Sequence, residues 1–308
     1  MTRKNLIFIV KVVMTMFLFI LFLKFAEPEK ILDILKRIEP GAILLGFIFV
    51  LLSVLVNCYR LLFLLRITGH ELTFRNLLHY HLIGFFFSLT LPGSTGGDIA
   101  RGWYIYKNDK NASETVSALI FWRFTGILSL VSLSCVAASV AYIFRGTPLV
   151  FVIVCLATLV ACSVLWTVSI RSSLMDRLMS RGHGLFRKLN DFVRCSRSFS
   201  FFSRDGGTNV ILTICVQLLI IFSWITISIS MEKNISFLVF FVAVPIIALL
   251  KSIPVTLGGV GLREGMSMML FSQFGVDTQT AFSLAMMQSV FFIFLGIIGG
   301  ALFAVKRT

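Results

Sequence analysis

Two short segments of the chain share a pattern of proline, glycine and arginine that is suited to binding an anion. Residues 92–101 read PGSTGGDIAR and residues 254–263 read PVTLGGVGLR, so both follow P-x-x-x-G-G-x-x-x-R. Proline interrupts a helix, and a glycine pair lets the backbone turn and lets a ligand approach it closely. A new half-helix that begins near Gly97 or Gly259 would offer free N–H groups and a positive dipole end to an anion.

The arginines of the two segments add a second kind of donor to the backbone amides. Arg101 and Arg263 stand about one helical turn beyond the glycine pairs, and a guanidinium matches the geometry of a phosphate group. Asp98 is placed to cap the first half-helix, and Glu264 directly follows Arg263. The predicted binding residues of the two segments are Pro92, Gly96, Gly97, Asp98, Arg101, Pro254, Gly258, Gly259, Arg263 and Glu264.

Four further polar side chains lie within or beside apolar segments, where a charge is expensive and therefore a candidate for function. Arg60 has two interpretations, because it either snorkels to the membrane surface or faces a binding pocket. Arg123 lies about two turns into its helix, which favours the pocket. Lys251 either joins the anion site or marks a membrane interface, and Gln288 is expected to face the interior of the helix bundle.

The sequence lacks the residue patterns of the common catalytic and metal sites. His79 and His81 are two positions apart and would face different sides of a helix, which does not favour a shared metal ion. There is no H-E-x-x-H, C-x-x-C or G-x-S-x-G, and no G-K-[ST] follows the glycine pairs. We therefore predict no catalytic residue, no metal ion and no cofactor, and we do not expect the chain to be an enzyme.

The composition predicts a protein that resides in the lipid bilayer. Of the 308 residues, 57% are hydrophobic and 14% are charged, whereas soluble domains average about 45–50% and about 25%. The net charge of +14 comes from basic residues in short loops, so we interpret it as membrane anchoring and not as nucleic-acid binding. Residues 1–308 are expected to form one all-α integral membrane domain.

Six apolar segments are long enough to cross a bilayer, which requires about 20 residues in a helix. They lie near residues 5–25, 41–65, 116–143, 148–170, 208–230 and 280–304. Two more, near 77–106 and 237–274, are interrupted by the shared motif, and irregular backbone at membrane depth must be buried in protein or line a cavity. The motif offset, 254 − 92 = 162, also relates the flanking spans, so the chain divides into half-repeats 1–146 and 147–308.

Positive charges indicate how these segments are oriented in the membrane. The loop 171–207 carries eight arginine or lysine residues against three aspartates, which places it in the cytoplasm. Basic residues near both termini place them in the cytoplasm as well, at the inner membrane. Counting crossings from this loop makes the two interrupted segments re-entrant hairpins that enter from opposite faces. Broken helices in an inverted repeat are the pattern of secondary transporters, whose binding site lies between the repeats.

The motif segments are similar to those of a known membrane family. Residues 91–101 (LPGSTGGDIAR) and 253–264 (IPVTLGGVGLRE) resemble the two signature segments of the flippase-like family, also called the lysylphosphatidylglycerol synthase transmembrane region. The resemblance extends over nearly the whole chain. That family includes the membrane half of bacterial lysyl-lipid synthases, free-standing proteins often associated with glycolipid assembly, and membrane regions of some archaeal glycosyltransferases. The resemblance implies that an aminoacylated phosphatidylglycerol or a polyprenyl-phosphate sugar is moved between leaflets.

The chain departs from the pattern expected of this family at two positions. Trp122 stands before Arg123 where the resemblance leads us to expect an acidic residue, and the last helix has no arginine near Gln288. These differences bear on the charges of the cavity and on the substrate. The synthases also carry a soluble aminoacyl-transfer domain after this region, and the sequence here stops four residues after the last predicted span. We therefore do not expect lysyl-lipid synthase activity.

These observations support three hypotheses for function. The preferred one is a flippase for an anionic membrane lipid, whose headgroup phosphate binds near Arg101 and Arg263. The second is a scaffold without transport activity, which presents lipid to a partner glycosyltransferase or other lipid-modifying enzyme that docks on loop 171–207. The third is a membrane-embedded transferase, which would need an acid or base near the anion site, and Asp98 and Glu264 are the obvious candidates.

Overall fold

The computed structural model is helical throughout the part of the chain that it describes. This part comprises residues 28–91, 95–109, 112–145, 204–231, 235–251 and 256–305, with a few isolated positions between 13 and 20 and between 153 and 160. The predicted spans near 5–25 and 148–170 and almost all of loop 171–207 lie outside the described residues, as do Pro92 and Pro254. The all-α fold class is confirmed for the described part, where every regular element is a helix.

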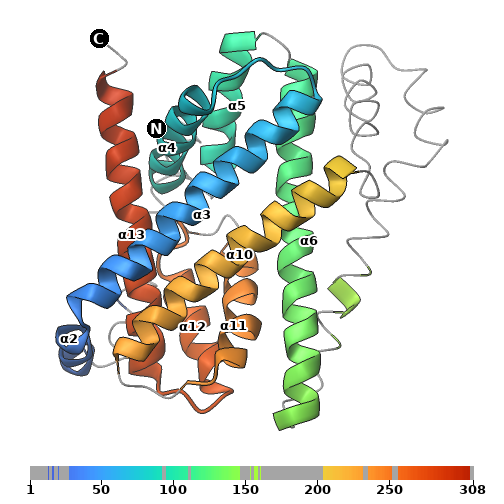
Figure 1. Ribbon diagram of the computed structural model, residues 1–308. Coiled ribbons are helices and arrows are strands. Elements are labelled where there is room, and N and C mark those ends of the chain that lie inside the picture. The colour runs from blue at the N-terminus through green and yellow to red at the C-terminus, as the bar shows by residue number, and fades with distance from the viewer. Residues whose placement is uncertain are drawn as a thin grey trace.

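Nine helices form the described part of the bundle (Figure 1). They are α2 (Pro28–Arg37), α3 (Pro40–Ile67), α4 (Phe74–Thr90), α5 (Thr95–Asp109), α6 (Ala112–Arg145), α10 (Arg204–Ser230), α11 (Phe237–Leu250), α12 (Leu262–Ser272) and α13 (Thr278–Val305). Within the described residues, four helices are long and apolar enough to cross a membrane, namely α3, α6, α10 and α13. They coincide with four of the six predicted spans. α2 is too short and too polar to appear among the predicted spans, and the sequence did not predict it.

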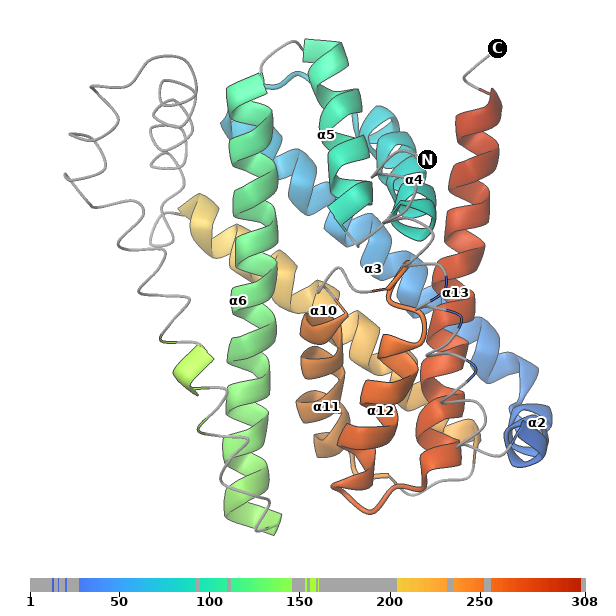
Figure 2. The same ribbon diagram turned by 180° about the vertical axis from the view of Figure 1, so that it is seen from behind.

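Each copy of the shared motif ends within the second arm of a helical hairpin, at Arg101 in one copy and at Arg263 in the other. α4 and α5 form hairpin A, and α11 and α12 form hairpin B. The four arms have 17, 15, 14 and 11 residues. At about 1.5 Å per residue, none of them reaches across a hydrocarbon core of about 30 Å. Figures 1 and 2 show the hairpins in opposite halves of the bundle, with hairpin A at the end where α13 finishes.

The contacts between helices recur in the two halves of the sequence. α3 and α10 lie side by side across the bundle (Figure 1). α4 packs against α13, and α11 packs against α6 in the same way. The starts of α4 and α11 are 237 − 74 = 163 residues apart, close to the offset between the motifs. Each hairpin therefore packs on the last long helix of the other half, so the two halves interlock and do not form separate bodies.

Glycines on α13 let hairpin A approach this helix closely. A Cβ atom at Gly299 would overlap the backbone carbonyl of Leu82, and one at Gly296 would overlap the side chain of Leu89. Aromatic contacts such as that between Phe86 and Phe303, with ring centroids 6.0 Å apart, extend the same interface. This close packing holds hairpin A against α13 and thereby sets the position of its tip.

The hydrophobic core has two main parts that share α3. The larger part joins α3 and α10 to hairpin B and α13, and in it the rings of Trp224 and Phe271 stack with centroids 6.0 Å apart. The second part joins α3 to hairpin A and α6, around buried Leu61 and Phe121. α3 contributes side chains to both parts and therefore ties the two hairpins into one bundle.

The turn between α3 and α4 is determined by local chemistry. Gly69 has a φ of 86°, a left-handed conformation that is costly for other residues, and it ends α3. The N–H of His70 then donates to the carbonyl of Leu65 at 3.0 Å, which completes the helix end. The Thr73 hydroxyl accepts a hydrogen bond from the N–H of Asn76 and starts α4. The turn brings α4 back against α3.

Candidate binding site: a cationic cavity between the hairpins

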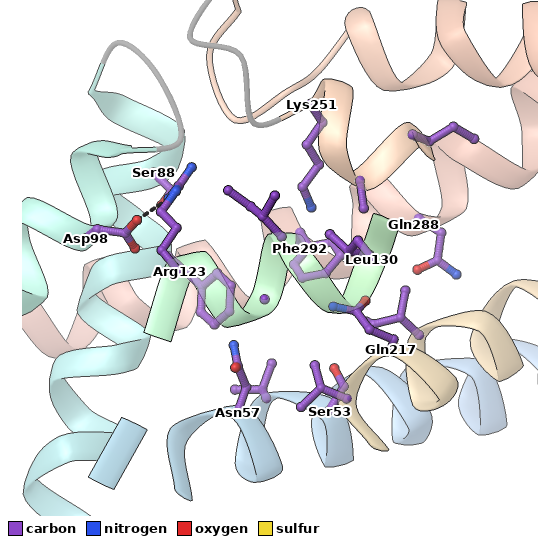
Figure 3. A pocket seen from close by; sticks show the side chains of 18 of the residues that line it. Ser53, Asn57, Ser88, Asp98, Arg123, Leu130, Gln217, Lys251, Gln288 and Phe292 are labelled. Carbon is purple, nitrogen blue, oxygen red and sulfur yellow. Dashed lines mark hydrogen bonds and ion pairs between the residues drawn. The ribbon is translucent and has the colours of Figure 1, made fainter. Parts of the chain in front are cut away.

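A cavity of about 300 Å³ lies between the two hairpins and the four long helices (Figure 3). Every described helix except α2 contributes to its lining. Its polar and charged lining residues are Ser53, Asn57, Arg60, His81, Ser88, Asp98, Arg101, Trp122, Arg123, Gln217, Trp224, Lys251, Arg263 and Gln288. The rest of the lining is predominantly apolar.

Of the fourteen residues predicted from the sequence, eight line this cavity. They are Arg60, Asp98, Arg101, Arg123, Lys251, Gly258, Arg263 and Gln288. Four others pack nearby without lining it, namely Gly96, Gly97, Gly259 and Glu264. The remaining two, Pro92 and Pro254, lie outside the described residues. The fold thus gathers side chains from the two halves of the sequence around one space.

On the side of hairpin A, one carboxylate joins two arginines. Arg101 Nη1 lies 2.6 Å from Asp98 Oδ1. Arg123 Nη1 contacts Asp98 Oδ2, as Figure 3 shows. Asp98 lies in the first turn of α5, but both of its oxygens are engaged by these arginines and not by the capping bond predicted for it. Arg101 is buried, whereas the side chain of Arg123 is 30% exposed, so Arg123 is the more accessible cation.

Arg60 faces the cavity and does not snorkel to the surface, which decides between its two interpretations. Arg60 is only 2% exposed, and its guanidinium donates a hydrogen bond to the backbone carbonyl of Trp122. The guanidinium carbons of Arg60 and Arg101 lie 5.2 and 5.7 Å from the centroid of the Trp122 ring. Such cation–π contacts stabilise a buried guanidinium without neutralising its charge. Arg60, Arg101 and Arg123 together form cationic group A.

On the side of hairpin B, two cations gather around the ring of Phe292. Lys251 Nζ lies 4.6 Å from the ring centroid, and the guanidinium carbon of Arg263 lies 5.2 Å from it. Arg263 also donates a hydrogen bond of 3.0 Å to the hydroxyl of Ser289. Lys251 and Arg263 form cationic group B. Neither forms an ion pair with a carboxylate of the described residues at contact distance, so their charge remains directed at the cavity.

Glu264 stabilises the start of α12 and corrects one prediction about that helix. α12 begins at Leu262, three residues after Gly259, and the N–H of Gly261 donates to Glu264 Oε2 at 2.6 Å. The other carboxylate oxygen accepts from the hydroxyl of Ser289. The positive end of α12 therefore already holds a carboxylate of the protein itself. An anion in the cavity would be bound mainly by side chains and not, as predicted, by free amides at this helix start.

The glycine pairs were predicted to turn the backbone and to let a ligand approach it, and the two pairs differ in this respect. Gly96 and Gly97 lie within α5, and a Cβ atom at Gly97 would overlap the Gly84 carbonyl and the Ser88 hydroxyl. In hairpin A the glycines therefore let the two arms approach each other. In hairpin B, Gly258 and Gly259 have φ values of 62° and 79° and make a left-handed turn, of which only Gly258 lines the cavity.

Several neutral polar residues of the cavity are absent from the predicted set. Ser53 and Asn57 come from α3, Gln217 comes from α10, and His81 comes from α4. Gln217 lies in an apolar span just as Gln288 does, so the signal that indicated Gln288 would also have found Gln217. The position of His81 in the sequence indicated at most a metal ligand. In the fold its ring is almost completely buried and lines the cavity.

These features define a helical membrane protein with a positively charged cavity between two broken hairpins. The sequence matches the family described as the lysylphosphatidylglycerol synthase TM region over residues 8–300, and the chain belongs to that family. The resemblance inferred from the two motif segments is thus confirmed over nearly the whole chain. Among curated proteins and among solved structures, no match was found.

Proposed function

We propose that the protein moves an anionic lipid between the leaflets of the cytoplasmic membrane, with the headgroup phosphate bound in the cavity. The observation that carries this proposal is the excess of positive charge around one cavity. Arg60, Arg101, Arg123, Lys251 and Arg263 line the cavity, and Asp98 is the only carboxylate among its described lining residues. Cations away from water are costly unless they are paired, and a phosphate would supply both charge and acceptor oxygens.

The size and lining of the cavity support a lipid whose tails stay outside it. About 300 Å³ is at the lower end for a small-molecule site and suits a headgroup better than a pair of acyl chains. The apolar part of the lining includes Phe85, Leu89, Ile127 and Leu130. The headgroup would bind among the cations, and the tails would leave the cavity along such apolar side chains.

The proposed path of the headgroup follows from the two hairpins. We propose that they are re-entrant, that they enter from opposite faces of the membrane, and that the termini and loop 171–207 are cytoplasmic. The opposed positions of the hairpins in Figure 2 support this topology, as does the recurrence of helix contacts in the two halves. Group A lies on the side of hairpin A and group B on the side of hairpin B, so we propose that a phosphate passes from one group to the other within one cavity.

We propose that the movement that exposes the cavity to each leaflet is not a simple rocking of the two sequence halves. α4 packs on α13 and α11 packs on α6, so such rocking would break both interfaces. We expect the moving units to combine helices from both halves, for example α4 with α13. Such combined units differ from the rocking of one repeat against the other that is common in inverted-repeat transporters.

Our proposal includes no catalytic step. Asp98 is engaged by Arg101 and Arg123, and Glu264 is engaged by Gly261 and Ser289. A carboxylate held as an ion-pair or capping partner is poorly suited to act as a general base. Because both carboxylates are already engaged by other groups of the protein, transport or lipid binding is favoured over the transferase hypothesis.

The test is leaflet exchange in vesicles that contain the purified protein. Labelled phosphatidylglycerol and a short polyprenyl-phosphate sugar would be followed, with the Arg101→Ala/Arg263→Ala variant as the site knockout. We expect exchange to fall at least about tenfold in this variant, because each arginine supplies charged hydrogen bonds to the phosphate. Arg75→Ala, at an exposed position of α4, is the matched control and should exchange lipid normally. The proposal would be contradicted by an exchange rate that is the same in the double variant as in the unmodified protein. It would also be contradicted by an exchange rate that never exceeds the rate in protein-free vesicles.

A further inference from the structure

From the neutral part of the cavity, we infer that the site selects lipids whose phosphate carries an uncharged polyhydroxylated group and rejects headgroups that carry an ammonium group. This inference rests on the proposed function and names the substrate class of the same site. Glycerol, inositol and sugar headgroups belong to the accepted class. Aminoacylated and other cationic headgroups belong to the rejected class.

Among the described residues, the cavity offers no carboxylate that is free to receive an ammonium group. Five cations line the cavity, and the one carboxylate of its described lining, Asp98, already contacts two arginines. Glu264 lies behind Arg263, fully buried, and accepts two hydrogen bonds from the protein. An added ammonium would meet like charge without a free counter-charge, and like charges in a poorly solvated site repel strongly.

A set of neutral donors and acceptors faces the same space. Figure 3 shows Ser53 and Asn57 on α3, Gln217 on α10 and Gln288 on α13 directed toward the cavity from neighbouring helices. Serine hydroxyls and side-chain amides both donate and accept hydrogen bonds. Sugar and glycerol hydroxyls have the same dual capacity, so this lining complements them.

Gln288 shows that the neutral lining has unused hydrogen-bonding capacity. The residue is 1% exposed, and its Nε2 donates to the Ser223 hydroxyl at 2.8 Å. Its Oε1 has no hydrogen-bond partner among the described residues, which is unusual for a buried acceptor. A headgroup hydroxyl would donate to this oxygen. An ammonium could also donate to it, but only beside the five cations of the cavity.

Three lipids with the same tails and the same phosphodiester test this inference. Phosphatidylglycerol carries two free hydroxyls, phosphatidylethanol carries none, and lysyl-phosphatidylglycerol adds cationic groups. Binding to the purified protein in detergent would be measured by competition against labelled phosphatidylglycerol, alongside leaflet exchange in vesicles. We expect phosphatidylglycerol to bind about tenfold more tightly than phosphatidylethanol, because hydrogen bonds to the buried amides are lost. Lysyl-phosphatidylglycerol should not compete measurably.

A variant that gains a function excludes misfolding as an explanation. Gln288→Glu places a carboxylate in the neutral lining, and we expect lysyl-phosphatidylglycerol to bind at least about tenfold more tightly while phosphatidylglycerol binds less tightly. Asn76→Asp makes the same amide-to-carboxylate change at an exposed position and should leave both affinities unchanged. Gln288→Leu should remove most of the preference for phosphatidylglycerol over phosphatidylethanol.

The outcomes separate this inference from the proposed function. Selective binding without leaflet exchange would uphold the selectivity and overturn the flippase. Leaflet exchange of phosphatidylglycerol and lysyl-phosphatidylglycerol at equal rates would overturn the selectivity alone. So would a Gln288→Glu variant whose affinity for lysyl-phosphatidylglycerol is no higher than that of the unmodified protein. Failure of every lipid to bind and to exchange would overturn both. Displacement of phosphatidylglycerol by an equal concentration of sn-glycerol 3-phosphate would show that the ligand is a water-soluble ester and not a lipid.

Discussion

Hairpins A and B carry the same motif but use it in different ways. In hairpin A, Gly97 is helical and lies against the opposite arm, and Arg101 pairs with the carboxylate of Asp98. In hairpin B, Gly259 adopts a left-handed conformation, and Arg263 bonds to the neutral hydroxyl of Ser289. The shared spacing therefore determines where each hairpin breaks and that an arginine reaches the cavity. The neighbouring residues determine how the backbone turns and what holds the arginine.

The position of the acidic residue explains much of this difference. Asp98 precedes Arg101 by one helical turn, so its carboxylate lies beside the guanidinium at the edge of the cavity. Glu264 follows Arg263 directly and bends back to the start of its own helix. The first carboxylate is part of the site, whereas the second is part of the framework beneath it.

The largest expected effect separates these two carboxylates. Glu264→Ala should lower the free energy of unfolding by about 3–5 kcal/mol, because it leaves two buried donors, the Gly261 N–H and the Ser289 hydroxyl, without their charged acceptor. Asp98→Ala should cost less, about 1–3 kcal/mol, because Asp98 and Arg123 are partly exposed in the cavity. Thermal unfolding of the purified variants in detergent measures both. Equal losses would contradict the division into site and framework.

A second, smaller effect distinguishes the two glycine pairs. Gly97→Ala should cost about 2–3 kcal/mol, because the new Cβ would overlap the backbone of Gly84, which cannot move aside. Gly259→Ala should cost about 1–2 kcal/mol through its left-handed backbone.

Asparagine substitutions at these two glycines make the comparison sharper. Asparagine tolerates a left-handed conformation better than alanine does, so Gly259→Asn should be milder than Gly259→Ala. At Gly97 the larger side chain should make asparagine worse than alanine. The same ranking at both positions, measured by thermal unfolding, would show that the glycines have one common role.

The smallest effect concerns two serines beside the arginines. Ser289→Ala should cost about 1 kcal/mol, because Ser289 bonds to both Arg263 and Glu264. Ser88→Ala should change stability by less than about 0.5 kcal/mol, because Ser88 lines the cavity and bonds to no charged side chain of the described residues. Chemical denaturation of the two variants side by side gives the difference. A larger loss at Ser88 would refute the assignment of Ser289 as the more important support.

Much of the architecture could be predicted because it depends on local composition. The spans near 41–65, 116–143, 208–230 and 280–304 appear as α3, α6, α10 and α13, since long apolar runs are stable in a bilayer only as helices. The two hairpin breaks were predicted for a similar reason, because a proline followed by a glycine pair disfavours a continuous helix. These features need no knowledge of distant contacts.

The backbone conformation of the two motif copies could not be predicted from their shared sequence pattern. Gly97 is helical because hairpin A closes on Gly84 and Ser88, and Gly259 is left-handed in the turn that leads into α12. Likewise, Arg60 had two interpretations until the packing of α3 against α6 placed it beside Trp122. The conformation of Gly97 and the position of Arg60 thus depend on contacts with groups that belong to other helices.

By itself, the sequence determined an all-α membrane protein with two broken hairpins, a repeated arginine motif and an excess of positive charge. These properties follow from residue types and short spacings, which act through hydrophobicity and backbone stereochemistry. Only the tertiary structure decided that α4 packs on α13 and α11 on α6, and that eight predicted residues share one cavity with Asn57 and Gln217. The physical reason is that close packing between distant helices selects one arrangement among many that the same apolar spans allow.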